Sequence, residues 1–398
     1  MISVAEARAR ILADLRPTAT ETVSIAQAWG RVLAEPVLAR LDQPPSDVSA
    51  MDGYALRAED PGPWTVIGSA PAGHPFAGSV GPNQAVRLFT GSFVPPGADA
   101  VAIQEDADRD GDRLTLRERP RPGRHIRPAG GDFASGQALL APGTRLSARA
   151  IGLSAASNHP WLTVHRRPRV AILATGDEIA LPGEKVPQGG IVSSNAHALA
   201  ALVAGAGADP VVLPIARDTV DAIAVTAEQL GGIDLLVTTG GASVGDHDLV
   251  QRGLGERGFA LDFWQIAMRP GKPLIFGRLG STPVLGLPGN PVSVVVCGIL
   301  FMAPAIARLA GRSESHVMFG TARLTAPVPQ NDRREDHLRA RLTTGEGGEL
   351  LVEPFAQQDS SHLRVLAEAG ALIQRPPHAP PAPAGTFVPI IRLDLIDQ

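Results

Sequence analysis

Residues 167–179, RPRVAILATGDEI, decide the fold class of this chain. The run RVAILAT within them is apolar without interruption, which is typical of a strand buried on both faces of a sheet. A helical pattern follows at residues 193–207, with Ser193 or Ser194 as its N-cap and Gly207 as its stop. The chain therefore passes from a buried strand directly into a covering helix.

The same alternation continues toward the C-terminus. The apolar runs PVVLPI (210–215) and LLVTT (235–239) flank a helical stretch at residues 218–230. Strand, helix, strand, helix and strand in that order are typical of a parallel sheet whose two faces are covered by helices. We therefore expect a central parallel-sheet α/β domain over residues 167–311, with a buried helix at its end.

The rest of the chain differs from this α/β part in the spacing of its apolar residues and in its content of Gly and Pro. Residues 1–41 and 140–166 have helical spacing, and we expect these two pieces to pack together as a helical linking domain. Between them, residues 42–139 carry Gly and Pro every few positions, which predicts an inserted β-rich domain. Residues 312–398 alternate apolar and polar positions around turns, which predicts a small C-terminal β-barrel-like domain. The predicted fold class is multidomain, α/β plus β.

Composition disfavours several classes of protein. The 398 residues carry 36 Lys and Arg against 40 Asp and Glu, a formal charge of −4, which argues against a strongly basic nucleic-acid binder. Cys297 is the only cysteine, so the chain has no internal disulfide and no Cys-based zinc site. The longest apolar run, 292–311, is interrupted by Pro304 and is too short to span a bilayer. Because residues 1–15 read as an amphipathic helix and not as a signal peptide, we expect a cytoplasmic protein without a membrane anchor.

Polar, glycine-rich segments follow the predicted strands. They are TGDE at 175–178, GGASVGDHD at 240–248 and PGNP at 288–291, and MRPGKP at 268–273 adds two cations. Ligands of open α/β sheets bind beyond the carboxyl ends of the strands, where backbone N–H groups surround anions. Each segment alone is also typical of an ordinary turn. Their coincidence on one edge of the sheet predicts a pocket for an anionic, phosphorylated ligand.

Carboxylates accompany these glycines. Glu178, Asp246 and Asp248 lie next to the predicted phosphate loop, and Mg²⁺ prefers a few carboxylates together with phosphate oxygens and water. A Mg²⁺ site is one interpretation, and a solvated acidic loop is the other. His247 has no second histidine near it in the sequence and is a poor candidate for a metal ligand. The residues alone do not define a reaction.

Six strings occur in the order in which one enzyme family has them. They are SAMDGYAL, RLFTGSFVPPGADAVAIQED, RPRVAILATGDEI, LLVTTGGASVGDHD, MRPGKPLIFG and LGLPGNPVS. Together they resemble the molybdopterin molybdenumtransferase family, which includes the E domain of gephyrin, and the match covers nearly the whole chain. The resemblance implies an elongated homodimer of four-domain subunits. It also implies a reaction in which adenylylated molybdopterin and molybdate give molybdenum cofactor and AMP with the help of Mg²⁺.

The resemblance assigns roles to individual residues. It implies catalytic carboxylates at Asp52, Asp132, Asp218 and Asp248, and metal ligands at Glu178 and Asp248. The implied substrate-binding residues are Thr90, Ser194, Asn195, Gly240, Gly241, Ser243, Gly245, Arg269, Lys272, Pro288, Gly289, Asn290, Arg339 and Ser360.

In the arrangement that the family implies, the GGASVG and PGNP loops hold the pterin and nucleotide phosphates. Arg269 and Lys272 help to hold molybdate or the dithiolene-bearing substrate. Arg339 and Ser360 face the cleft from the final β domain. Asp52 and its loop approach the α/β domain of the other subunit.

Three positions depart from the family pattern. Ser193 stands where the family often has Asp, Arg269 stands where Lys is frequent, and Asp359 stands where Gly is usual. The first change removes a carboxylate, and the second keeps a charge but not its shape. The third lies directly beside Ser360.

Two other functions remain compatible with the sequence. Relatives of the α/β domain adenylylate molybdopterin with ATP, although that activity needs neither the insert nor the last domain. A scaffold or cofactor-binding role, which the gephyrin E domain also has, is the second, although this sequence shows no fused partner domain or long linker. The insertase interpretation implies a molybdopterin adenylyltransferase upstream and apo-molybdoenzymes downstream as partners, with no nucleic acid and no membrane.

Overall fold

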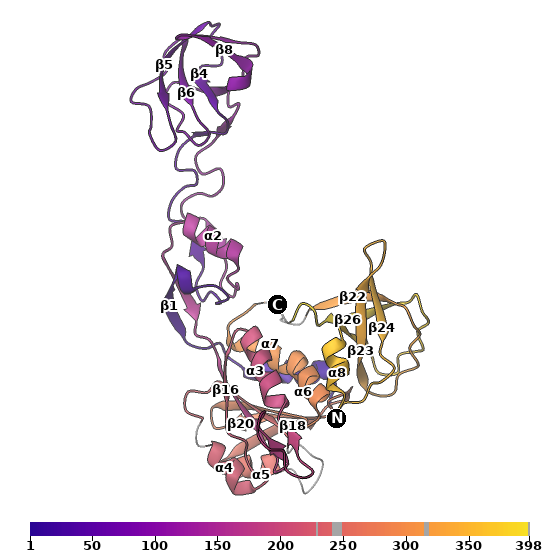
Figure 1. Cartoon of the computed structure of the whole chain (residues 1–398). Coiled ribbons are helices and arrows are strands. Elements are labelled where there is room, and N and C mark those ends of the chain that lie inside the picture. The colour runs from indigo at the N-terminus through magenta and orange to yellow at the C-terminus, as the bar shows by residue number, and fades with distance from the viewer. Residues whose placement is uncertain (228–229, 241–248, 314–317, 397–398) are drawn as a thin grey trace.

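The computed structural model describes residues 1–227, 230–240, 249–313 and 318–396. The chain is elongated, with an upper lobe, a narrow neck and a broad lower part that holds an α/β domain beside a β-barrel (Figure 1). We use these names for the following spans: upper lobe, 48–127; neck, 20–38 and 138–165; α/β domain, 4–14 and 169–309; barrel, 319–392.

A mixed sheet forms the centre of the α/β domain, in the order β16-β13-β17-β21-β20-β18. Its strands are β13 (Arg169–Ala174), β16 (Asp209–Val212), β17 (Leu235–Thr239), β18 (Phe259–Gln265), β20 (Pro273–Leu279) and β21 (Thr282–Leu287). The first four in that order are parallel, as predicted. Strand β20 runs antiparallel to both of its neighbours, β21 and β18. Only Gly280 and Ser281 separate β20 from β21, and so short a turn reverses the chain.

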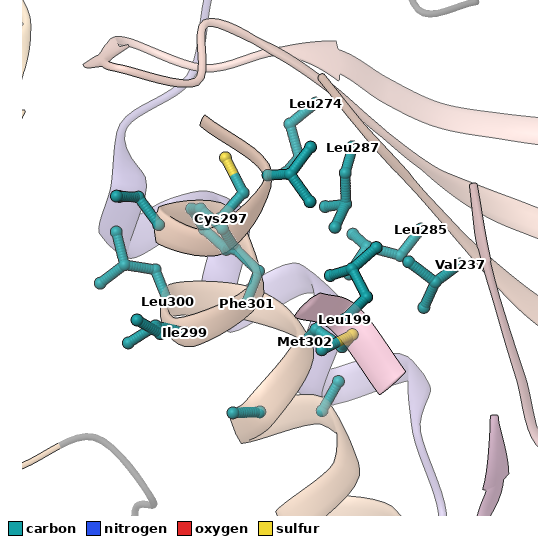
Figure 2. Packing of buried hydrophobic residues seen from close by; sticks show 14 of the residues in the cluster. Leu199, Val237, Leu274, Leu285, Leu287, Cys297, Ile299, Leu300, Phe301 and Met302 are labelled. Atoms are coloured by element: carbon teal, nitrogen blue, oxygen red, sulfur yellow. The ribbon is translucent and has the colours of Figure 1, made fainter. Parts of the chain in front are cut away.

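Helices cover both faces of this sheet, since successive side chains of a strand point to opposite sides. Val170 and Ile172 of β13 belong to one core, and Ala171 and Leu173 belong to the other. The helices on the first face are α3 (Asn195–Gly205), α6 (Pro291–Cys297) and α7 (Ala303–Leu309), and those on the second are α4 (Val220–Ala227) and α5 (Leu249–Gly255). Figure 2 shows the first core, with Cys297 near Leu274 of the sheet and Met302 near Leu199 of α3.

The N-terminal helix α1 (Val4–Asp14) belongs to the α/β domain. Its buried side chains Val4, Ala7 and Ile11 lie in the same core as α3 and α7. The prediction that segments 1–41 and 140–166 pack together as helices is therefore wrong for this part. The spacing of the apolar stripe identified a helix but carried no information about which surface covers it.

The apolar run near residue 300 forms one continuous helix. The prediction that Pro304 interrupts it is wrong, because a π-helical turn, η3 (Gly298–Met302), precedes the proline. Pro304 follows this turn as one of the first residues of α7, and the changed hydrogen-bond spacing of the π-helical turn accommodates its missing N–H. By length and composition residues 291–309 are sufficient to cross a bilayer, but 89% of the most apolar window is buried inside this protein. Such burial is typical of a core helix.

The neck joins two distant segments through strands. β1 (Thr20–Ser24) pairs with β12 (Trp161–His165), and β2 (Val37–Leu38) pairs with β11 (Ala138–Leu140). The short helix η1 (Ile25–Gln27) and α2 (Ala148–Ala156) complete the unit. Beyond residue 14 the predicted helix of the first segment is therefore wrong. The β-branched run Thr20–Ser24 favours the extended conformation that its partner strand stabilises.

The upper lobe is built around a second mixed sheet, in the order β7-β4-β6-β5-β9-β8. Tyr54 packs in its core, and the guanidinium of Arg87 lies 5.1 Å from the centre of its ring. The elements of this lobe are β3 (Val48–Ser49), β4 (Gly53–Leu56), β5 (Trp64–Ala70), β6 (Gln84–Leu88), β7 (Ala100–Ile103), η2 (Gln104–Asp106), β8 (Ala107–Asp110), β9 (Arg113–Leu116) and β10 (Ile126–Arg127).

The C-terminal strands close into a five-stranded barrel. Their order is β23-β24-β22-β26-β25, and β25 pairs again with β23. The parallel strand β19 (Met268–Arg269) extends from the α/β domain to pair with β23 and ties the two units together. The barrel elements are β22 (Phe319–Leu324), β23 (Glu335–Thr344), β24 (Leu350–Pro354), α8 (Leu363–Glu368), β25 (Ala371–Arg375) and β26 (Phe387–Arg392).

Candidate active site

Hydrogen bonds bring the ends of two sheet strands and one helix together at the carboxyl edge of the sheet. Asn195, the first residue of α3, donates from Nδ2 to Thr239 Oγ1 (3.0 Å) and to the carbonyl oxygen of Gly289 (2.7 Å). The Thr239 hydroxyl donates in turn to the carbonyl oxygen of Pro288 (3.1 Å). The end of β17 and the loop after β21 are thereby fixed against the start of α3.

Glycine is required where the second loop begins. Gly240 has φ +89°, and a Cβ there would lie 2.5 Å from the carbonyl oxygen of Thr175 in the first loop. A Cβ on Gly289 in the third loop would lie 3.7 Å from Cα of Gly240. The described ends of the three loops thus approach one another at their backbones, where a side chain on residue 240 would not fit.

A pocket of about 370 Å³ opens beside these contacts, and we call it the smaller pocket. The ribbon formed by β14 (Ile179–Ala180) and β15 (Ile191–Val192) makes one wall. The first residues of α3 make another, so the positive end of the helix dipole lies at the pocket. The predicted residues that line it are Glu178, Ser194, Asn195, Gly240, Gly289 and Asn290.

A larger pocket of about 630 Å³ adjoins the first and shares Gly289 and Asn290 with it. Besides these two, the predicted residues in its lining are Arg269, Lys272, Pro288 and Ser360. The lining also contains residues that sequence reasoning did not assign to the site, among them Arg334, Gln358 and Asp359. For Arg334 the available signal was the charged string NDRREDHLRAR at 331–341.

Asn290 links the α/β domain to the barrel in the wall of the larger pocket. It precedes α6 as the N-cap, but its side chain does not cap the helix. Instead its Nδ2 donates to Ser360 Oγ (2.7 Å), and the N–H of Val292 donates to the carbonyl oxygen of Ser360 (3.1 Å). The barrel segment that holds Ser360 is therefore fixed to the start of α6.

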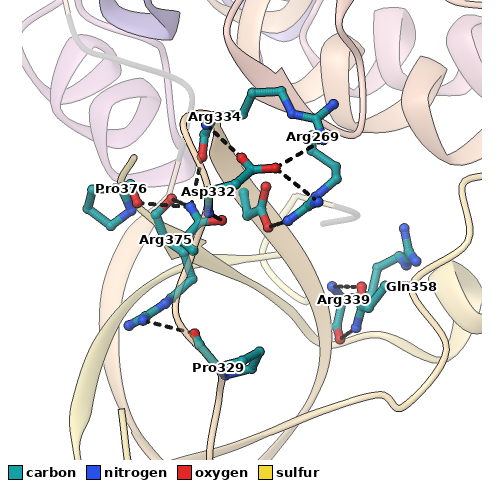
Figure 3. Close-up of polar contacts among 10 residues, drawn as sticks. Arg269, Pro329, Asp332, Arg334, Arg339, Gln358, Arg375 and Pro376 are labelled. Atoms are coloured by element: carbon teal, nitrogen blue, oxygen red, sulfur yellow. Dashed lines mark hydrogen bonds and ion pairs between the residues drawn. The ribbon is translucent and has the colours of Figure 1, made fainter. Parts of the chain in front are cut away.

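Carboxylates of the barrel hold Arg269 (Figure 3). Its Nη1 lies 3.4 Å from Asp332 Oδ2, and its Nη2 donates to Asp336. The hydrogen bond to Asp336 raises the pKa of the Arg269 guanidinium. The charge of Arg269 is thus largely balanced within the chain, whereas Lys272 is exposed and forms no ion pair with any described residue. Lys272 is the more available cation for an anionic ligand.

Arg339 does not face the cleft as the family resemblance implied. Its side chain is fully buried and lines neither pocket. It lies opposite Leu372 on β25, where the barrel packs against the core of the α/β domain. Burial lowers the pKa of Arg339, and the side-chain amide of Gln358 bonds to its backbone N–H (3.0 Å) and carbonyl (2.9 Å).

Acidic side chains gather near the first loop. The N–H of Asp218 donates to Asp177 Oδ1 (3.4 Å), and Glu178 lines the smaller pocket. Burial, and then the negative charges of Glu178 and Asp177, raise the pKa of Asp218. Within the described part of the chain, no three acidic, His or Cys side chains are grouped closely enough to hold a metal ion. Asp248 lies outside the described residues, as do the predicted Gly241, Ser243 and Gly245.

Three predicted residues lie far from both pockets, in the upper lobe or next to it (Figure 1). The N–H and hydroxyl of Thr90 donate to Asp52 Oδ1 (2.7 and 2.9 Å), and the backbone bond from Thr90 lowers the pKa of Asp52. Asp132 is exposed, and its N–H donates to the carbonyl oxygen of Gln43 (2.9 Å). The neck separates Asp52, Thr90 and Asp132 from the two pockets of the same chain.

The single cysteine takes no part in either pocket. Cys297 is fully buried, and burial raises the pKa of its thiol. It packs in the core shown in Figure 2. A buried, protonated thiol is a packing group and not a nucleophile.

Comparison with known proteins identifies the units just described. The model of the MoeA N-terminal region (domain I and II) matches residues 2–157. A probable molybdopterin binding domain matches residues 171–308, and the MoeA C-terminal region (domain IV) matches residues 321–393. Together these matches cover the upper lobe, the neck, the α/β domain and the barrel.

Whole-chain relatives agree with these matches. The molybdopterin molybdenumtransferase of Nostoc sp. is 36% identical over 370 residues, 90% of this chain and 85% of the relative. The molybdopterin molybdenumtransferase 2 of Mycobacterium tuberculosis is 35% identical over 400 residues, 97% of this chain and 98% of the relative. The crystal structure of the molybdopterin biosynthesis moeA protein from Pyrococcus horikoshii OT3 superposes with a TM-score of 0.86 at 28% identity, over 98% of this chain and 100% of that one. This chain therefore belongs to the MoeA family, whose curated members named here are molybdopterin molybdenumtransferases.

Proposed function

We propose that this protein inserts molybdenum from molybdate into adenylylated molybdopterin and releases AMP. The observation that carries the proposal is the pair of adjoining pockets that share Gly289 and Asn290, in a chain of the MoeA family. Two adjoining pockets suit a reaction that joins an oxyanion to a phosphorylated organic substrate.

The larger pocket has the chemistry of an oxyanion site. Lys272 supplies a positive charge that no described residue neutralises. The amide of Asn290 retains an N–H after bonding to Ser360, and both residues line the pocket. Molybdate would be held by these donors, since charge-assisted hydrogen bonds to an oxyanion are the strong ones.

The smaller pocket has the chemistry of a phosphate site. The N-terminus of α3 stabilises negative charge, and Gly240 and Gly289 leave the backbone open to close approach. The diphosphate that links AMP to the pterin would lie here. Attack of water on the AMP phosphorus breaks its bond to the bridging oxygen, so that AMP leaves and the pterin keeps its own phosphate. Attack by a molybdate oxygen would give adenylyl molybdate instead, and hydrolysis of that mixed anhydride would then release AMP.

The acids near the first loop fit a Mg²⁺ ion. Their oxygens are the ligands that Mg²⁺ prefers. Burial is the main cause of the raised pKa of Asp218, and the negative charges of Glu178 and Asp177, which a cation would offset, add to it. We propose Glu178 and Asp248 as its protein ligands, with Asp218 beside them. When bound, the ion would supply positive charge that offsets the charge of the phosphates.

The residues of the upper lobe require a second subunit. The bonds from Thr90 hold Asp52 ionised and oriented, but Asp52 lines neither of the two pockets of its own chain. Met51 and Phe89 beside it are apolar and exposed, as expected of a surface that a partner covers. We therefore propose a homodimer in which Asp52, Thr90 and Asp132 of one subunit approach the pockets of the other.

The decisive experiment measures AMP release from adenylylated molybdopterin, with and without molybdate and Mg²⁺, followed by reconstitution of a cofactor-free molybdoenzyme. Release that needs both ions, together with reconstitution, is the expected result. Tight binding without turnover would instead favour the cofactor-binding role, and product formation from ATP and unmodified molybdopterin would favour the adenylyltransferase role.

The substrate and product define the proposed cellular partners. An adenylyltransferase must supply the activated pterin, and apo-molybdoenzymes must accept the finished cofactor. We propose that both transfers take place in the cytoplasm.

A further inference from the structure

A third cavity, of about 650 Å³, opens on the barrel, and we call it the barrel cavity. Arg269 and Gln358 line both this cavity and the larger pocket, so the two spaces adjoin. No role in the proposed reaction has yet been given to the barrel cavity. A substrate as long as a substituted pterin is able to extend from one space into the other.

Three charged residues lie in a row along one side of the barrel cavity. Strand register places Arg269 of β19 opposite Asp336 of β23, and Asp336 opposite Arg375 of β25. Directly opposed side chains of neighbouring strands lie within contact reach. All three residues line the cavity, and Asp336 and Arg375 are only 4% and 7% exposed.

Two buried polar atoms of these three residues have no hydrogen-bond partner among the described residues. Asp336 uses Oδ2 to accept from Arg269, but its buried Oδ1 has no hydrogen-bond partner among the described residues. The buried Nε of Arg375 also has none, although the Nη2 of Arg375 donates to the carbonyl oxygens of Pro329 and Pro380. A buried charged group that lacks a hydrogen bond lowers the free energy of unfolding of the protein. One acceptor and one donor, each without a hydrogen-bond partner among the described residues, therefore belong to residues that lie directly opposite each other.

The remaining walls of the barrel cavity combine polar residues, namely Gln330, Asn331, Glu353 and Gln358, with a larger apolar part. Proline rings and one aromatic ring predominate in the apolar part, and such surfaces suit the faces of a flat heterocycle. The apolar lining residues are Pro327, Val328, Pro329, Leu338, Pro354 and Phe355.

We propose that the barrel cavity binds the pterin ring of the substrate through its lactam edge. Asp336 Oδ1 accepts from the ring N3–H and the 2-amino group, and Arg375 Nε donates to the carbonyl oxygen at C4. The substituted end of the pterin then points across Arg269 into the larger pocket, where Lys272 lies. This assignment rests on the proposed function, because it locates one part of the proposed substrate.

The test uses two ring compounds without dithiolene or phosphate, namely pterin and lumazine. Lumazine has an oxygen in place of the 2-amino group and therefore presents an acceptor to Asp336. Binding is followed by the fluorescence of either compound at a pH at which both are neutral. Wild-type protein is expected to bind pterin at least about tenfold more tightly than lumazine, the usual effect of one lost charge-assisted hydrogen bond. Asp336→Asn should weaken pterin binding and abolish this preference.

A second variant avoids the buried charges. Ala356 is exposed at the rim of the barrel cavity, so Ala356→Trp should block the cavity without disturbing the fold. Ala384 is exposed on the same domain and lines none of the pockets described here, which makes Ala384→Trp the matched control. Pterin binding should fall at least about tenfold in the first variant and remain unchanged in the second.

The outcomes separate this inference from the proposed function. Equal binding of pterin by wild type and Ala356→Trp, or no preference for pterin over lumazine in the wild type, would overturn the barrel-cavity assignment. Neither result touches AMP release or cofactor formation, which test the proposed function. Conversely, pterin binding that is selective and blocked by Ala356→Trp would stand even if AMP release proved independent of molybdate.

Discussion

Asn290 Nδ2 and Ser360 Oγ lie 2.7 Å apart and join the α/β domain to the barrel inside the wall of the larger pocket. Asn290 is the N-cap residue of α6, but its side chain makes this contact and does not cap the helix. The pocket is therefore a property of the interface between two domains. Its shape depends on how the barrel is held against the sheet.

Ser360→Ala tests the importance of this contact. Loss of one hydrogen bond at the domain interface should reduce molybdenum insertion by a few-fold to about tenfold, with little change in the melting temperature. Insertion activity and thermal unfolding are the measurements. Ser281→Ala, in the exposed turn between β20 and β21, is the control and should match the wild type. Activity of Ser360→Ala equal to that of the control would show that the contact has no functional role.

Lys272 and Lys185 are the two lysines of the chain, which permits a matched comparison. Lys272→Gln should raise the KM for molybdate by about tenfold or more, because the pocket loses the cation that no described acid neutralises. Lys185 is exposed and lines none of the pockets discussed here, so Lys185→Gln should leave the KM unchanged. Steady-state kinetics with varied molybdate measures both. An unchanged KM in Lys272→Gln would exclude Lys272 as the oxyanion ligand.

The raised pKa of Asp218 predicts the pH dependence of stability. Because the folded pKa lies above the ordinary value of 3.8, the folded state binds the proton more tightly than the unfolded state does. The stabilising contribution is full below pH 3.8 and is lost as pH rises through the folded pKa. Asp218→Asn should therefore melt at a higher temperature than the wild type at pH 7.

The same variant tests the proposed cation. Mg²⁺ should raise the melting temperature of the wild type more than that of Asp218→Asn, since the variant lacks one negative charge near the ion. Asp221→Asn, on the exposed face of α4, is the control and should respond to Mg²⁺ as the wild type does. Equal shifts in all three proteins would remove Asp218 from the cation site.

Gly271 and Cys297 should be energetically coupled. Gly271 has φ +108°, and a Cβ there would lie 2.5 Å from Cys297 Sγ. Gly271→Ala should lower the free energy of unfolding by about 1–3 kcal/mol through this clash and through backbone strain. Adding Cys297→Ala removes the sulfur and should restore part of the loss, although the strain at φ persists. A double-mutant cycle by urea unfolding measures the coupling, and strict additivity would contradict the close contact.

A site shared between subunits can be tested by complementation. Mixed expression of Asp52→Asn and Lys272→Gln chains gives some dimers in which one site has both wild-type residues, if the two residues come from different subunits. Random mixing should then restore about a quarter of wild-type activity, since half of the dimers are mixed and each has one intact site. Sites contained within one chain would give no recovery, because each chain then carries a defect in its own site.

Local pattern was enough to predict the elements around the site. The uninterrupted apolar run before Thr175 identified a buried strand, and the Gly-rich segments after it identified the functional edge of the sheet. By contrast, the residues after position 14 were wrongly predicted as helical, because tertiary pairing of β1 with β12 outweighs weak local preference. Pro304 was wrongly predicted as a break, since a π-helical turn absorbs it.

The sequence by itself determined the family, the α/β core and the three loops at its edge, because periodicity and motif order are local properties of the chain. Tertiary structure alone decided which side chains the loops can use. Arg269 and Lys272 look alike in the string MRPGKP, yet barrel carboxylates neutralise only the former. Arg339 matches its family position but is buried, whereas Ser360 lies in the pocket wall. These differences arise because charge pairing and burial depend on residues that are brought together only when the barrel closes against the sheet.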